Sequence, residues 1–255
     1  MTYVETRLQA ANDIMTAAEA LALKYFNERD RFVLEEKNAS EFVSEADRNV
    51  EALIRDQLAQ LLPSDQAMGE EMGGDGGEAF WSIDPIDGTA NFLRGTPLWG
   101  VSLGFIENGR STVGVISYPS LGLRLGAATG LGIWKNGERF DRKVHFPSVK
   151  VAAVGESPRW TIEGISEIEV ALRKAGWGVA EFRCATVGLG FAALGYTDGY
   201  IEKNTSIWDI AAGSVICAEA GLEVFSTGTY EVAKQNIIAA TTDVHAVVGT
   251  YFADR

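Results

Sequence analysis

Two carboxylates, a proline, a glycine and a hydroxyl group occur within six consecutive positions, Asp84-Pro85-Ile86-Asp87-Gly88-Thr89. Residues 80–83 before them predict a short buried strand, which Pro85 ends directly after Asp84 because proline fixes φ and has no amide hydrogen. Gly88 allows a ligand to approach the main chain closely, and Thr89 can open a helix whose free N–H groups face an anion. The pattern therefore places oxygen ligands beside an anion site.

Phosphate transfer assisted by a hard cation is the chemistry that such residues suit. The carboxylates of Asp84 and Asp87 and the carbonyl of Ile86 are the kind of oxygen ligand that Mg²⁺ prefers. Two such ions about 3.5–4 Å apart can activate a water molecule and stabilise a leaving oxygen. Each aspartate taken singly is also common in plain turns, so the prediction depends on partners elsewhere in the chain.

Three further acidic residues are candidates for that partnership. Glu70 follows the strand-like Ala67-Met68 and precedes a glycine-rich loop. Asp47 stands three residues after Ser44, which is the spacing of a helix cap, and Asp209 lies at or near the start of a small-residue helix. Capping of a helix is the alternative explanation for Asp47 and for Asp209.

The composition limits the classes of function. The chain has 255 residues, 46% of them hydrophobic, which predicts a soluble globular protein with a large core. A formal charge of -13 argues against a nucleic-acid or anionic-membrane surface. A leader peptide and a long apolar segment are both missing from the pattern, so we expect a cytoplasmic protein. Two cysteines and two histidines disfavour a disulfide framework, a thiolate zinc site and a Ser-His-Asp triad.

The hydrophobic pattern predicts a mixed α/β fold in two parts. The first part has a helix over residues 3–27, a charged loop or hairpin within 29–41, a second helix from Ser44, and a meander of antiparallel hairpins. The polar stretch 141–150 predicts a boundary, giving subdomains 1–145 and 146–255. The second part alternates strands and helices: strands near 151–154, 179–182, 198–203 and 237–240, and helices over 162–174, over 208–221 and from 243.

Four ordered segments together resemble the inositol monophosphatase family of lithium-sensitive, magnesium-dependent phosphatases. They span nearly the whole chain, and the resemblance implies a layered αβαβα sandwich, commonly a homodimer, that acts on a small phosphorylated substrate. The segments are Phe42-Val43-Ser44-Glu45-Ala46-Asp47, Gly69-Glu70-Glu71, the run from Asp84 to Phe92, and Trp208-Asp209-Ile210-Ala211-Ala212-Gly213 with Glu219-Ala220-Gly221.

The resemblance also implies a set of ligands for two or three Mg²⁺ ions. One ion would be held by Glu70, Asp84 and the carbonyl of Ile86, and a second by Asp84, Asp87 and Asp209. A third, looser ion would again involve Glu70, which makes this residue part of the catalytic set.

The remaining implied roles concern water and substrate. Thr89, with Asp47 behind it, would orient and help to deprotonate the attacking water, and the amides of Gly88 and Thr89 would hold the phosphate. Glu202 would contact a hydroxyl group of a sugar or polyol. The substrate contacts implied in this way are Asp87, Gly88, Thr89, Ala185 and Glu202.

Departures from the family pattern leave the substrate open. Leu222 stands where a second glycine is common, and Arg183-Cys184-Ala185-Thr186 replaces a small Gly-Ser type of segment. Inositol monophosphate is the favoured substrate; histidinol phosphate, fructose 1,6-bisphosphate and nucleotide 3'-phosphates are alternatives. A phosphatase of the haloacid dehalogenase type is disfavoured. Its two acids stand at Asp-x-Asp spacing, whereas two residues separate Asp84 from Asp87 here. A regulatory protein-binding scaffold is the alternative from another class of function.

Overall fold

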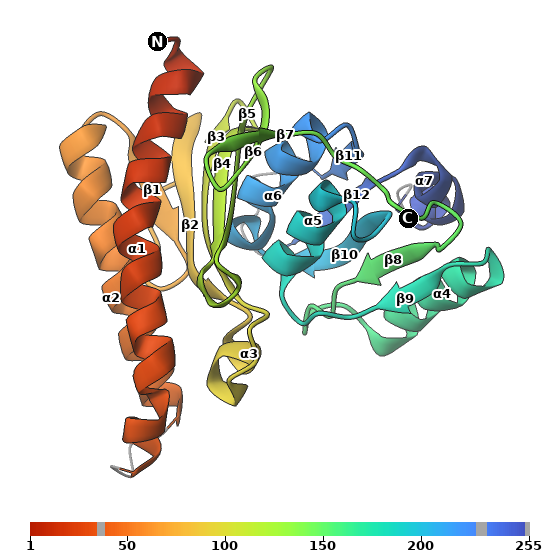
Figure 1. The fold of residues 1–255 in the computed structure, drawn as a ribbon, viewed down its shortest axis with the longest axis horizontal. Helices are drawn as coiled ribbons and strands as arrows, with labels where there is room; N and C mark the ends of the chain where they lie inside the picture. The colour runs from red at the N-terminus through yellow and green to blue at the C-terminus, as the bar shows by residue number, and fades with distance from the viewer. Residues whose placement is uncertain (35–38, 228–233, 253–255) are drawn as a thin grey trace.

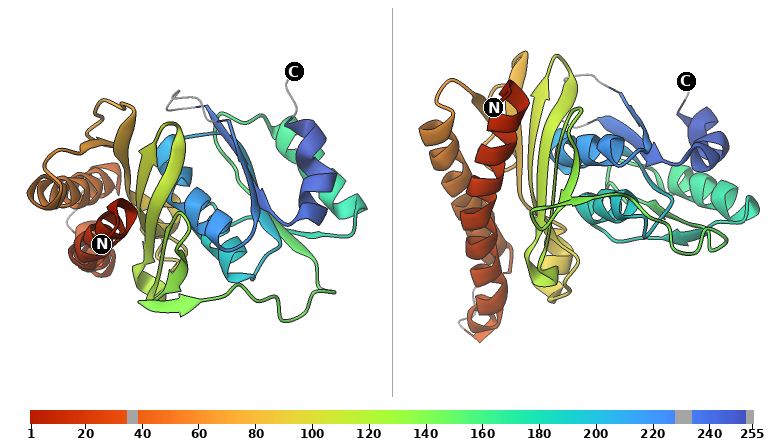
Figure 2. Two further views of the ribbon diagram at one scale, coloured as in Figure 1. Left: turned by 90° about the horizontal axis from the view of Figure 1, so that it is seen from above. Right: turned by 45° about the horizontal axis from the view of Figure 1, so that its top comes forward.

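The computed structural model describes residues 1–34, 39–227 and 234–252, and for residues 30–34 and 39–44 it describes the backbone alone. The chain folds into five layers, in the order helices, sheet, helices, sheet, helices (Figure 1). Figure 2 shows the same order from two further directions. The predicted αβαβα sandwich is therefore confirmed. The helices of its layers are α1 (Tyr3–Leu34) and α2 (Ala39–Leu61), then α5 (Ala185–Leu194) and α6 (Ile207–Glu219), then α4 (Ile162–Lys174) and α7 (Thr242–Val248).

The first sheet is the predicted meander. Its strands lie side by side in sequence order, with β1 parallel to β2 and each later pair antiparallel. The turns Asn108-Gly109 and Asn136-Gly137 have φ values of 51°, 73°, 51° and 83°, as tight hairpin turns require. The strands are β1 (Gln66–Gly69), β2 (Ala79–Asp87), β3 (Gly100–Glu107), β4 (Arg110–Tyr118), β5 (Leu123–Ala128), β6 (Gly132–Lys135) and β7 (Glu138–Phe140).

The second sheet has the strand order β11-β12-β10-β8-β9. Helix α6 packs against β3 and β4 of the first sheet and against β11 and β12 of the second. The segment 141–150 connects the sheets, and the division at residues 145 and 146 into two subdomains stays a prediction. The strands of this sheet are β8 (Val151–Val154), β9 (Gly178–Ala180), β10 (Gly199–Thr205), β11 (Glu223–Ser226) and β12 (Gln235–Ala240).

Two helix boundaries differ from the prediction. Helix α1 continues to Leu34, because residues 28–34 contain no glycine or proline that would end it. Helix α2 begins at Ala39, so Ser44 lies inside the helix and the predicted cap at Ser44 was wrong. Residues 35–38 of the predicted loop lie outside the described residues.

Pro85 was predicted to end strand β2 directly after Asp84. The strand instead continues to Asp87. Asp84 pairs with Ser102 of β3 and Asp87 pairs with Gly100, so three steps along β2 match two steps along β3. This extra residue is a β-bulge, where a proline is tolerated because the ladder is locally interrupted. In a regular strand, residues three apart point to opposite faces, and the bulge lets both aspartates share one face.

Candidate active site

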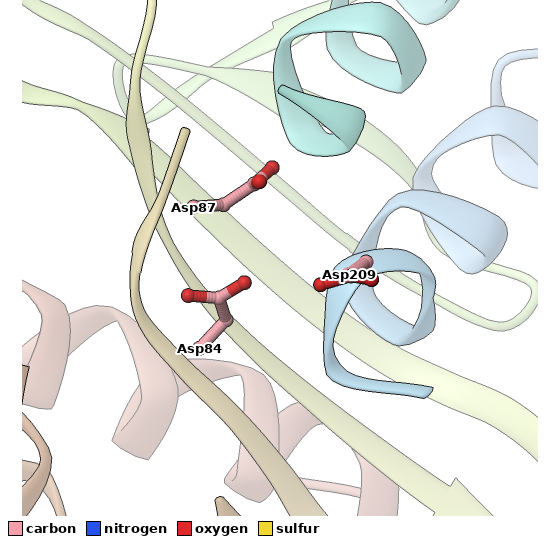
Figure 3. A group of neighbouring side chains, drawn as sticks. All are labelled: Asp84, Asp87 and Asp209. Atoms are coloured by element: carbon pink, nitrogen blue, oxygen red, sulfur yellow. The ribbon is translucent and has the colours of Figure 1, made fainter. Parts of the chain in front are cut away.

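Three aspartates meet between the first sheet and the middle helices. Asp84, Asp87 and Asp209 each offer one carboxylate oxygen, and these oxygens lie within 4.8 Å of one another (Figure 3). Asp84 and Asp87 come from the bulged end of β2, and Asp209 comes from the first turn of α6. The structure thus brings together three of the five predicted metal ligands.

The start of helix α6 fixes the position of Asp209. Its Oδ2 accepts hydrogen bonds from the backbone N–H of Ser206 at 2.8 Å and from the hydroxyl of Thr205 at 2.5 Å. Asp209 is therefore the third helical residue of a capping box whose N-cap is Ser206, and the same carboxyl group also belongs to the acidic cluster. The capping bonds restrict its rotation, which suits a ligand that must hold one geometry.

The start of helix α5 fixes Asp87 in a similar way. Oδ2 of Asp87 accepts hydrogen bonds from the N–H of Thr186 at 2.6 Å and from the thiol of Cys184 at 3.1 Å. Gly88 has a φ of 84°, and a Cβ at this position would lie 3.0 Å from Cβ of Cys184. The contacts of Cys184 and Thr186 were missed in the sequence, which carries no local signal for a pairing across nearly a hundred residues.

The electrostatics of the cluster favour a bound cation. Burial, followed by the charges of Glu70 and Asp87, raises the pKa of Asp84 well above its ordinary value. Burial and the charge of Asp87 raise the pKa of Asp209 to about 6. A hard divalent cation fits this set of donors, because all are carboxylate oxygens and a positive charge would relieve their mutual repulsion.

Glu70 and Asp47 lie next to the three aspartates. Glu70 is exposed as a residue, but its carboxyl group interacts electrostatically with those of Asp84, Asp87 and Asp209. Loss of hydration, followed by the charges of Asp209 and Asp87, raises the pKa of Glu70 to about 8. Asp47 is buried on α2, and burial followed by the charge of Glu70 raises its pKa to about 8. Both acids are therefore electrostatically part of the site.

The predicted water-activating pair is not joined directly. The hydroxyl of Thr89 donates to the carbonyl of Ile86 at 3.4 Å. Among the hydrogen bonds of the described residues, none connects Thr89 to Asp47. The role of this pair, and that of the Ile86 carbonyl as a ligand, stay predictions.

A cleft of about 170 Å³ adjoins the cluster and is lined by Asp87, Asp209, Ala185 and Glu202, among others. Glu202 is buried, and its Oε2 accepts a hydrogen bond from the hydroxyl of Tyr200 at 2.8 Å. Burial, followed by the charge of Asp209, raises the pKa of Glu202 to about 8. Three of the five predicted substrate contacts, Asp87, Ala185 and Glu202, thus line one cleft together with Asp209.

Comparison with known proteins shows which family has this arrangement. A sequence profile of the inositol monophosphatase family matches residues 4–251. The chain belongs to the inositol monophosphatase family. It is therefore a phosphatase that hydrolyses phosphate monoesters, and its family depends on metal ions.

Relatives within the family have different substrates in their names. The chain is 31% identical over 226 residues to a fructose-1,6-bisphosphatase/inositol-1-monophosphatase of Aquifex aeolicus, covering 87% of this chain and 86% of that protein. It is 34% identical over 192 residues to a histidinol-phosphatase of Mycobacterium tuberculosis, covering 70% and 72%. The structure resembles an inositol monophosphatase from Anabaena, with a TM-score of 0.79, 25% identity, and coverage of 100% of this chain and 98% of that chain.

A helix that crosses a bilayer must be both long and apolar. No helix within residues 1–34, 39–227 and 234–252 meets both requirements.

Proposed function

We propose that this inositol monophosphatase family member is a Mg²⁺-dependent phosphatase of a small phosphorylated polyol, with inositol monophosphate as the favoured substrate. The observation that supports this is the cleft of about 170 Å³ beside the acidic cluster, with the buried carboxyl group of Glu202 in its wall. A carboxyl group can accept or donate hydrogen bonds to several hydroxyl groups, which suits a polyol. The small volume favours a substrate much smaller than a typical drug.

The residues of the chain divide the work of hydrolysis. Asp84, Asp87, Asp209 and Glu70 would hold Mg²⁺, with two or three ions in each site. When bound, Mg²⁺ neutralises charge on the phosphate and makes water a stronger nucleophile at neutral pH. Thr89, with Asp47 behind it, would orient that water and help to deprotonate it.

The bulged end of β2 would hold the phosphate itself. The amides of Gly88 and Thr89 follow the bulge directly, and the left-handed backbone of Gly88, with φ 84°, turns the chain into α3 (Thr89–Arg94). Because Asp87 is fixed by the start of α5, this turn has a defined position relative to the acidic cluster.

The experiment that tests the proposal is Mg²⁺-dependent phosphate release from four esters: inositol 1-phosphate, histidinol phosphate, fructose 1,6-bisphosphate and a nucleotide 3'-phosphate. We expect inositol 1-phosphate to give the highest kcat/KM. A higher kcat/KM for another ester would transfer the assignment to that ester, and no release from any of the four by metal-loaded protein would contradict the proposal.

One observation favours fructose 1,6-bisphosphate as the second candidate. Arg159 and Arg183 line the cleft and could bind a second phosphate. The guanidinium group of Arg159 is oriented by the carbonyl of Asn204 at 2.8 Å and the hydroxyl of Ser206 at 2.8 Å. Arg183 has a left-handed backbone, with φ 53°, and lies 3.6 Å from Glu156 in a solvated ion pair.

Replacing Arg183 by asparagine separates the two candidates. Asparagine tolerates a left-handed backbone, so Arg183→Asn removes the charge and leaves the start of α5 in place. We expect kcat/KM for fructose 1,6-bisphosphate to fall about tenfold, the effect of one charged hydrogen bond, and kcat/KM for inositol 1-phosphate to change little. Arg173→Asn, on the exposed end of α4, is the matched control. Equal losses for both esters would remove the argument for a second phosphate subsite.

Several properties implied by the resemblance also belong to the proposal. They are a homodimer, inhibition by lithium and a cytoplasmic location, and light scattering, LiCl titration and cell fractionation test them in turn. A regulatory scaffold remains the alternative of another class, and a stoichiometric partner that binds wild type and Asp84→Asn equally would favour it.

A further inference from the structure

Glu51 is a charged side chain of α2 that is completely buried, with 0% of its surface exposed. Its Oε2 accepts a hydrogen bond from the N–H of Glu71 at 2.9 Å, and its Oε1 accepts one from the N–H of Met72 at 3.2 Å. Both amides belong to the loop that follows β1 and carries Glu70. A buried carboxylate is costly unless it is paired and hydrogen-bonded, and here the main chain of this loop supplies the bonds.

Arg55 completes the arrangement one helical turn further along α2. Its Nε donates to Oε1 of Glu51 at 2.7 Å, its Nη1 donates to the carbonyl of Ala67 at 3.2 Å, and its Nη2 donates to the carbonyl of Gly73. The planar guanidinium group thus connects Glu51 to both ends of the loop. Gly69 and Gly73 also exchange two backbone hydrogen bonds, of 2.9 and 3.1 Å, which close the loop.

Gly69 shows how closely the loop approaches the helix. A Cβ at this position would lie 2.2 Å from Oε1 of Glu51 and 2.4 Å from its Cδ. Since real Cβ atoms do not come so close to other heavy atoms, only glycine allows this approach. The backbone of residues 69–73 is therefore packed directly against the carboxylate.

Asp47, Glu51 and Arg55 follow one another at intervals of four residues, so they lie on one side of α2. The first of them is electrostatically coupled to Glu70, and the other two bind the loop that carries Glu70. We infer that Glu51 and Arg55 are positioning residues, which fix Glu70 relative to the acidic cluster through the backbone of its own loop. This inference rests on the proposed role of Glu70 as a metal ligand.

The decisive experiment compares Glu51→Gln with Glu19→Gln. Glutamine keeps the shape but loses the charge and one of the two acceptor oxygens. Glu19 forms an ion pair with Arg124 that joins α1 to the first sheet, so Glu19→Gln is a matched loss of a Glu–Arg pair away from the site. We expect Glu51→Gln to raise the Kd for Mn²⁺, measured by calorimetry, by about tenfold or more. The concentration of Mg²⁺ needed for half-maximal activity should rise by a similar factor.

Two further readouts separate positioning from general stability. Hydrogen exchange at the amides of Glu71 and Met72 should accelerate in Glu51→Gln and stay unchanged in Glu19→Gln, whatever each variant loses in Tm. The KM for the ester should change less than the activation constant for Mg²⁺. Should Glu51→Gln fail to fold, Arg55→Lys tests the same contacts, because lysine keeps the charge and lacks the fork that reaches Ala67 and Gly73.

Two results would overturn the inference. One is an unchanged Mn²⁺ affinity in Glu51→Gln although hydrogen exchange at Glu71 and Met72 has accelerated. The other is an equal loss of Mn²⁺ affinity in Glu51→Gln and Glu19→Gln. Calorimetry and hydrogen exchange need no substrate. If the wild-type protein hydrolyses none of the four esters, the proposed function fails, and these two measurements still decide the role of Glu51 and Arg55.

Discussion

Replacing Asp84 by asparagine is expected to lower the rate of phosphate release by at least about a hundredfold. Removing a residue that only hydrogen-bonds to a metal ligand usually lowers activity by about ten- to a hundredfold, and loss of a ligand should cost more. Asp84 is only 1% exposed and lies within the acidic cluster, where the charges of Glu70, Asp87 and Asp209 act on it. Asparagine has the same shape, and its Oδ1 can keep the hydrogen bond that the N–H of Ile86 donates at 3.1 Å. The substitution therefore removes a charge and leaves the bulge of β2 in place.

The same substitution is expected to stabilise the metal-free fold. Removing one of several buried like charges relieves repulsion, so the Tm in EDTA should rise or stay level, and the increase in Tm caused by Mg²⁺ should shrink. Asp198→Asn is the matched control, because Asp198 accepts structural hydrogen bonds from Val151 at 3.0 Å and Trp177 at 3.1 Å. That variant should lose Tm and keep its turnover. Full turnover by Asp84→Asn would refute the assignment of Asp84 as a metal ligand.

The elements that were predicted correctly have patterns set by their immediate neighbours. Helix α4 begins after Thr161, whose hydroxyl accepts a hydrogen bond from the N–H of Gly164 at 3.1 Å, and its expected bounds 162–174 are those observed. The Asn-Gly turns fixed the hairpins in the same way, because few other residues adopt positive φ. Such signals lie within a few residues of the structure that they specify.

Helix α5 shows why other elements escaped prediction from periodicity. Nine of its ten residues are buried, because it lies between two sheets and packs against α6. A helix surrounded by protein has no polar face, so its sequence Ala185–Leu194 carries no 3.6-residue alternation. The start of this helix holds Asp87, so an essential contact of the site depends on an element that periodicity cannot detect.

The residues of the site also differ in whether a local sequence signal marks them. Asp84, Asp87 and Asp209 could be predicted as a set, because their residue types and neighbours form an ordered motif, and the structure brings them together. Glu51 and Cys184 could not, since their contacts depend on how a helix packs against a distant loop or strand end. The acidic cluster is thus visible in the sequence, while the contacts that surround it become visible only in the fold.

The metal-free protein is expected to lose stability as the pH rises from about 5 to 8, and Mg²⁺ is expected to reverse this loss. The pKa of Asp209 is raised to about 6 and those of Asp47 and Glu202 to about 8, whereas unfolded carboxyl groups titrate near about 4. Between these values the folded state binds more protons than the unfolded state, so the free energy of unfolding falls with rising pH.

Thermal unfolding in EDTA and in Mg²⁺, at pH 5.5 and pH 8, measures both effects. The Tm in EDTA should fall between these pH values, and the increase in Tm caused by Mg²⁺ should be larger at pH 8, because the ion binds deprotonated carboxylates. Glu202→Gln separates the two contributions, since Glu202 is buried in the cleft wall outside the proposed ligand set. This variant should show a smaller fall in EDTA and keep its response to Mg²⁺. A Tm in EDTA that stays level or rises toward pH 8 would mean that the fold itself already neutralises the negative charges of these carboxyl groups. The electrostatic argument for a cation in this cluster would then fail.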